Sequence, residues 1–128
     1  MSKYEALIAE YEEEVTIEER NMKNDGLYAD GFVWINGRLT SAAKTCILAE
    51  EIGHHFTSVG DILDQNDIDN QKQEHKARVW AYQKLLPLEN VHLVAMRGYT
   101  EPWQMAEYFD LDEEFVRAAL KYYGLLDV

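Results

Sequence analysis

The sequence is poor in cysteine, basic residues and long apolar runs, and each shortage excludes a class of protein. Its single cysteine, Cys46, cannot form an internal disulfide and is typical of a reducing compartment. No apolar run approaches the roughly 18 to 20 residues that cross a bilayer. Residues 1–14 are acidic and lack the basic and apolar regions of a signal peptide. We therefore expect a cytoplasmic protein that does not bind membranes.

Basic residues are outnumbered: 12 Lys and Arg stand against 24 Asp and Glu, a formal net charge of −12. Nucleic acids and anionic lipids are bound largely through Lys and Arg, so this balance argues against direct nucleic-acid binding. It favours cations and protein partners with basic patches. The alternative, that the charge only keeps the protein soluble, stays open.

The chain has enough apolar and aromatic residues for a core. Hydrophobic residues make up 47% and aromatic residues 12% of 128 positions, which suits one compact domain. Pro87 and Pro102 are far apart, and no repeat or linker-like tract divides the sequence. We predict a single domain over residues 1–128, with a core at 1–98 and a helix pair at 99–128.

Local patterns predict an α+β fold that is mostly helical. Asp30-Gly31 stands between two apolar β-prone runs, a strong signal for a two-residue hairpin turn. Apolar spacing and capping residues indicate helices elsewhere. The polar stretch 58–71 is typical of a loop. The prediction is a small antiparallel sheet with strands at 27–29 and 32–35, and helices at 2–14, 40–56, 71–86, 88–97, 101–109 and 112–123.

The last two predicted helices superficially resemble a helix-turn-helix. A recognition helix needs positive charge to enter a groove. Residues 99–128, however, hold only Arg117 and Lys121 against seven acidic residues. We therefore expect this pair to pack on the core or to dock a protein partner.

Glu50-Glu51-Ile52-Gly53-His54 is the segment that carries chemistry. A zincin helix has the pattern His-Glu-x-x-His, in which two ligands one turn apart share a face and the glutamate acts as general base. Here Glu50 replaces the first histidine, and Glu50 and His54 can still reach one ion. A carboxylate oxygen is an acceptable zinc ligand. On spacing alone, an exposed helix face with adjacent glutamates is an alternative.

The surroundings of this segment resemble the ImmA/IrrE family, in particular its branch associated with phages and mobile elements. The resemblance covers residues 45–57 with Gly60-Asp61-Ile62, a second block at 74–87, and Trp34-Ile35-Asn36 in the predicted hairpin. It implies the family fold and a zinc-dependent endopeptidase ancestry. By position, Glu51 matches the general base, His54 the second zinc ligand and Glu74 the third, whereas Glu50 stands at the usual first histidine.

Some members of this family cleave a repressor, so the resemblance implies a repressor or other transcription regulator as substrate or partner. The leading hypothesis is a zinc-dependent endopeptidase that cleaves or inactivates a phage or mobile-element repressor. The main rival is a catalytically impaired member that acts as a protein-binding, antirepressor-like regulator. A structural metal site without catalysis is a third alternative.

Neighbouring residues compete for the same roles. His55 points about 100° around the helix from His54, so it would support the site rather than bind the ion. Asp61 could return a carboxylate to the metal, although a turn residue is the simpler interpretation. His75 could replace Glu74 as ligand or stabilise an oxyanion. Cys46 is expected to be a buried structural cysteine.

Overall fold

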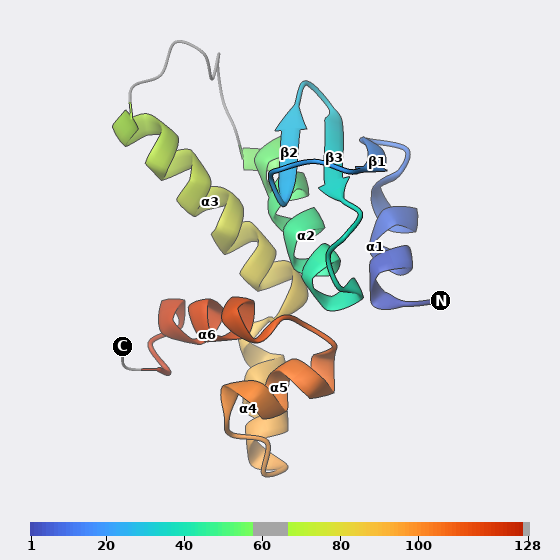
Figure 1. Ribbon diagram of the computed structural model, residues 1–128. Helices are drawn as coiled ribbons and strands as arrows, with labels where there is room; N and C mark the ends of the chain where they lie inside the picture. Colours follow the sequence, from blue (N-terminus) through green and yellow to red (C-terminus); the bar gives the residue numbers. More distant parts are fainter. Residues whose placement is uncertain (58–66, 127–128) are drawn as a thin grey trace.

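The computed structural model describes the backbone of residues 1–57 and 67–126 and the side chains of residues 1–57 and 70–126. Helix α2 lies in the middle of the molecule, with α1 and the sheet on one side and α3 on the other (Figure 1). The mostly helical α+β class is confirmed. The elements are α1 Lys3–Tyr11, β1 Thr16–Arg20, β2 Gly26–Ala29, β3 Phe32–Asn36, α2 Ser41–Thr57, α3 Asp67–Leu85, α4 Leu88–Met96, α5 Pro102–Phe109 and α6 Glu113–Tyr122.

The predicted hairpin is present as β2 and β3. Its turn residues, Asp30 and Gly31, have φ values of 48° and 84°. Positive φ at both central positions matches the right-handed twist of the two strands, and Asp-Gly adopts it readily. The turn therefore fixes the antiparallel register, in which Tyr28 pairs with Val33.

A third strand, β1, was not predicted. It pairs parallel with β3, from Thr16 opposite Phe32 to Arg20 opposite Asn36, so the sheet is mixed and has the order β1-β3-β2. Only Ile17 of β1 is partly buried, and its other residues are exposed. An edge strand that buries one side chain has no clear alternation of apolar and polar residues, so its sequence gives no strand signal.

Helix α2 begins as predicted, but α3 begins earlier. The Thr40 hydroxyl accepts a hydrogen bond from the backbone N–H of Ala43 at 3.2 Å, which caps α2. Helix α3 begins at Asp67 instead of residue 71, so the last part of the stretch predicted as a loop is helical. A polar composition alone does not distinguish a loop from the first turn of a helix, so the predicted start was about one turn late. Asp61 lies outside the described residues.

Helices α2 and α3 meet backbone to backbone at Gly53 and Ala77. A β-carbon built on Gly53 would lie 2.5 Å from the Ala77 carbonyl oxygen and 3.1 Å from its Cα. No side chain fits this gap, so glycine is required for the close approach. The contact lies one residue from His54 and three from Glu74, and it brings these two side chains to the same junction.

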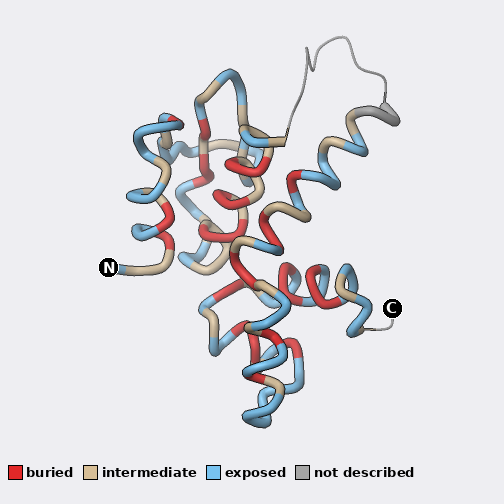
Figure 2. The backbone as a smooth tube through the Cα atoms, turned by 180° about the vertical axis from the view of Figure 1, so that it is seen from behind, coloured by how far each residue is buried: buried red, intermediate tan, exposed pale blue. Residues whose placement is uncertain are grey.

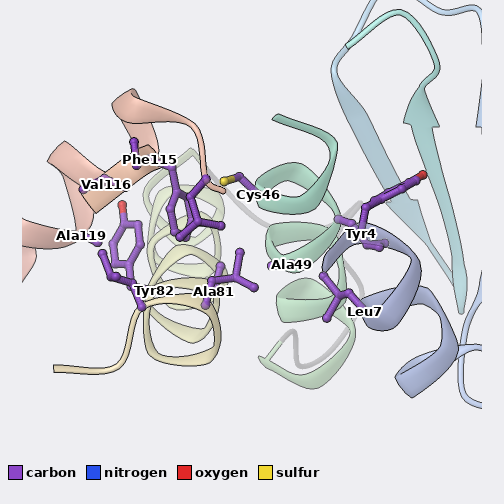
Figure 3. Close-up of a cluster of buried hydrophobic side chains, with 14 of the residues drawn as sticks. Tyr4, Leu7, Cys46, Ala49, Ala81, Tyr82, Phe115, Val116 and Ala119 are labelled. Carbon is purple, nitrogen blue, oxygen red and sulfur yellow. The ribbon is translucent and has the colours of Figure 1, made fainter. Parts of the chain in front are cut away.

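The core surrounds α2. Figure 3 shows Tyr4 and Leu7 of α1 on one side of this helix, and Tyr82 of α3 with Phe115 of α6 on the other. The buried segments of the backbone face one another across these helices, and the outer faces are exposed (Figure 2). Among the described helices, none is long and apolar enough to span a membrane.

Candidate active site

Three elements build a pocket of about 340 Å³ around the predicted site. Strand β2 forms one wall, α2 forms the floor, and α3 closes the opposite side. Glu51, His54 and Glu74, three of the predicted site residues, line this pocket. The remaining lining residues are Gly26, Leu27, Tyr28, Asn70 and Gln73.

His54 and Glu74 are in direct contact. The Nε2 atom of His54 lies 3.1 Å from Oε1 of Glu74, and the His54 side chain is only 12% exposed. Two ligand atoms on one tetrahedral zinc ion, each with a bond of about 2.0 Å, are roughly 3.3 Å apart. The separation of this pair therefore fits two ligands of a single ion.

Glu50 is not among the residues that line this pocket. It lines a second cavity of about 480 Å³, together with Arg78 and Tyr82 of α3 and residues of α6. Among residues 1–57 and 70–126, no three His, Cys, Asp or Glu side chains are grouped closely enough to hold a metal ion. The structure thus brings Glu51, His54 and Glu74 to one pocket but leaves Glu50 facing another.

The two adjacent glutamates resist ionisation. Burial raises the pKa of Glu51 to about 8, and the negative charges of Glu74 and Glu50 add to this effect. Burial also raises the pKa of Glu50 to about 7; Arg78 opposes the rise, and Glu74 contributes to it. A site with this excess of carboxylates in a poorly solvated place favours a bound cation or proton.

His55, His75 and Cys46 are not among the residues that line this pocket. His55 turns toward β2, where its Nδ1 atom lies 2.7 Å from the Tyr28 hydroxyl. His75 packs against Tyr122 of α6, with ring centroids 6.2 Å apart, and lines other surface pockets. Cys46 is buried as predicted, and burial raises the pKa of its thiol to about 12.

Three pocket residues on β2 were not predicted from the sequence: Gly26, Leu27 and Tyr28. A β-carbon on Gly26 would lie 2.4 Å from Cγ2 of Ile47 and 3.1 Å from Cγ of Glu51, so the strand approaches α2 very closely there. A glycine at a strand position is a recognised signal for such an approach. Tyr28 gave no comparable signal, because its pocket neighbours are far away in sequence.

The site combines a histidine and two partly buried glutamates of α2 with a glutamate of α3, beside a small sheet. Such a set of residues suits a metallopeptidase-like domain. Residues 9–121 match the IrrE N-terminal-like domain, and the chain belongs to this metallopeptidase family. The match spans all the residues that line the smaller pocket. It confirms the family resemblance that the sequence indicated. No curated protein matches the chain.

Proposed function

We propose that the chain is a zinc-dependent endopeptidase of the ImmA/IrrE type that cleaves a phage or mobile-element repressor. One observation carries the proposal: the His54–Glu74 pair, with its 3.1 Å separation, shares a pocket with Glu51. Family membership supports the reaction class, because the family is one of metallopeptidases.

His54 and Glu74 would hold the zinc ion in this pocket. Glu50 would be the third ligand after its side chain turns away from the larger cavity. Its place one turn before His54 on α2 supports this role, because residues four apart share a helix face. A bound zinc ion supplies Lewis acidity and lowers the pKa of a coordinated water.

Glu51 would act as the general base. It follows Glu50 by one residue, about 100° around the helix, so it can face the water without binding the ion. Its carboxylate accepts a proton as the water oxygen bonds to the peptide carbonyl carbon. The same proton then passes to the amide nitrogen as the C–N bond breaks.

The proposed partner is a repressor or another transcription regulator. Proteins that bind DNA carry basic surfaces for the phosphate backbone. A chain with a net charge of −12 is complementary to such a surface, which promotes encounter between the two proteins.

A second function has its own supporting observation. Glu50 lines the larger cavity, and no three candidate ligands are grouped among the residues with described side chains. A family member that binds metal poorly could keep the fold and act by docking on the regulator. This antirepressor-like module is the alternative to the enzyme.

Co-expression with a candidate repressor from the same source separates the two functions. The enzyme hypothesis predicts that wild type releases repressor fragments and relieves repression, and that Glu51→Gln does neither although it stays folded. Loss of a general base typically costs about 10²- to 10⁴-fold in rate. Glu107→Gln, at an exposed position of α5, is the matched control and should behave as wild type. Relief of repression by both wild type and Glu51→Gln, without fragments, would establish the docking module instead.

A further inference from the structure

The hydroxyl group of Tyr28 is held by two partners at the edge of the candidate active site. The backbone N–H of Gly31 donates a hydrogen bond to it at 3.1 Å, and Nδ1 of His55 lies 2.7 Å from it. The two rings meet edge to face, with centroids 5.7 Å apart. Gly31, in the turn between β2 and β3, and His55, on α2, therefore hold the Tyr28 side chain in place.

The tautomer of His55 decides where the proton of the Tyr28 hydroxyl points. A phenol has one proton to donate and two lone pairs that accept. Gly31 occupies one lone pair. If the neutral His55 ring carries its proton on Nδ1, it donates to the second lone pair, and the phenolic proton is left for a third partner. Acceptance of two hydrogen bonds also orients that proton.

The third partner would lie in the pocket, because Tyr28 lines it together with Glu51, His54 and Glu74. Among the described residues that line this pocket there is no other hydroxyl group, and the other neutral donors are the side-chain amides of Asn70 and Gln73. His75, the residue that the sequence suggested for oxyanion stabilisation, packs against Tyr122 in a different place. Tyr28 is the lining residue whose hydroxyl group is already held in place by hydrogen-bond partners outside the pocket lining, which makes it the candidate donor for a developing oxyanion.

We propose that Tyr28 donates its phenolic proton as a hydrogen bond to the carbonyl oxygen of the scissile peptide, and that His55 is the positioning residue that holds it in this role. The inference rests on the proposed peptidase function. During attack the carbonyl oxygen gains negative charge, and a fixed donor at that position stabilises the transition state more than the substrate. No proton is transferred from Tyr28 in this step.

The first test does not depend on activity. A long-range proton–nitrogen NMR spectrum of the protein at neutral pH reports which ring nitrogen of His55 is protonated, and the His55→Asn variant assigns its signals. We expect a proton on Nδ1. A proton on Nε2 alone would overturn the proposal, because the Tyr28 proton would then be donated to His55.

Kinetics provide the second test, with the repressor as substrate. Tyr28→Phe should lower kcat by about 10²- to 10³-fold while KM and zinc content stay near wild type, as for removal of an oxyanion donor. His55→Leu should lower kcat less, and His55→Asn should recover most of the loss because its amide can donate near the position of Nδ1. Tyr108→Phe, which removes an exposed hydroxyl on α5 bonded to Arg97, is the control.

Different experimental outcomes would contradict the peptidase proposal and the oxyanion role of Tyr28. If wild type cleaves the repressor and Tyr28→Phe keeps its kcat, the oxyanion role is wrong and the peptidase stands. If wild type cleaves nothing, the peptidase hypothesis and this role both fail, whatever the tautomer of His55.

Discussion

Gly53 of α2 lies against the backbone of Ala77 in α3, so closely that a β-carbon would stand 2.5 Å from the Ala77 carbonyl oxygen. The distance between these two helices sets the distance between His54 and Glu74, because one residue of the pair comes from each helix. The packing of a glycine thereby controls the geometry of the candidate metal site.

Gly53→Ala should therefore damage both stability and the site. The new methyl group meets backbone atoms that cannot rotate away, so α3 has to shift. Overpacking of this kind typically costs about 1–3 kcal/mol of unfolding free energy, measured by urea denaturation. The shift should also weaken zinc binding.

The double variant Gly53→Ala with Ala77→Gly is the informative control. The clash is with the carbonyl oxygen, Cα and carbonyl carbon of Ala77, none of which is removed by Ala77→Gly. The second change should therefore give no rescue. Recovery of wild-type stability in the double variant would show that the side chains, not the backbones, set the helix separation.

The stability of the metal-free protein should fall as pH rises from about 4.5 to about 8. The folded-state pKa values of Glu50 and Glu51 are raised to about 7 and about 8 from a usual value of 4.5, so the folded state holds protons that the unfolded state releases. This contribution is fully present below pH 4.5 and is lost as pH passes the raised values. Thermal melts in a chelating buffer measure it.

Two variants test the origin of this pH dependence. Glu51→Gln should flatten the fall and make the metal-free protein more stable than wild type at pH 8. Glu107→Gln, on the exposed face of α5, should leave the profile unchanged. Zinc should restore most stability at the upper end of the range, because a cation compensates the ionised carboxylates.

Glu50→His should raise zinc affinity by about tenfold or more, equivalent to roughly 1.4 kcal/mol of binding free energy. An imidazole at this position restores the two-histidine helix pattern, one turn before His54. Titration against a competing chelator, with elemental analysis of untagged protein, gives affinity and stoichiometry. If neither wild type nor Glu50→His holds stoichiometric zinc, the ligand assignment is wrong.

No duplex DNA binding is expected at physiological salt. The net charge is −12, and of the two basic residues in α6, Arg117 already pairs with Glu113 at 2.9 Å. Phosphate contacts need free basic side chains. A gel shift with random-sequence duplex at low salt is the check, and salt-sensitive binding would contradict this expectation.

The sequence predicted the elements whose signals are local. Asp30-Gly31 specified the hairpin turn, Thr40 capped α2, and Pro87 separated α3 from α4, because each acts on the backbone near it. Strand β1 was not predicted, because the β3 residues with which it pairs lie 16 positions further along the chain. Its own side chains are nearly all exposed and show no periodicity.

The sequence predicted those parts of the site whose positions depend on the spacing of residues along a helix. Residues 51 and 54 share a helix, and the second block of the family resemblance supplied Glu74. The sequence could not show that Glu50 lines the larger cavity. Residues of α6, which are distant in sequence, form part of that cavity. Tyr28 was missed for the same reason: its partner His55 lies 27 residues away.

Helix α1 is tied to the end of α5, which is far away in sequence. The ammonium group of Lys3 donates a hydrogen bond to the backbone carbonyl of Phe109, 106 residues away, and lies 5.5 Å from the centre of that ring. On a ribosome that adds about 5–20 residues per second, α1 must wait roughly 5–20 seconds for this partner to be made. Helix α1 thus completes its contacts only after α5 has been synthesised.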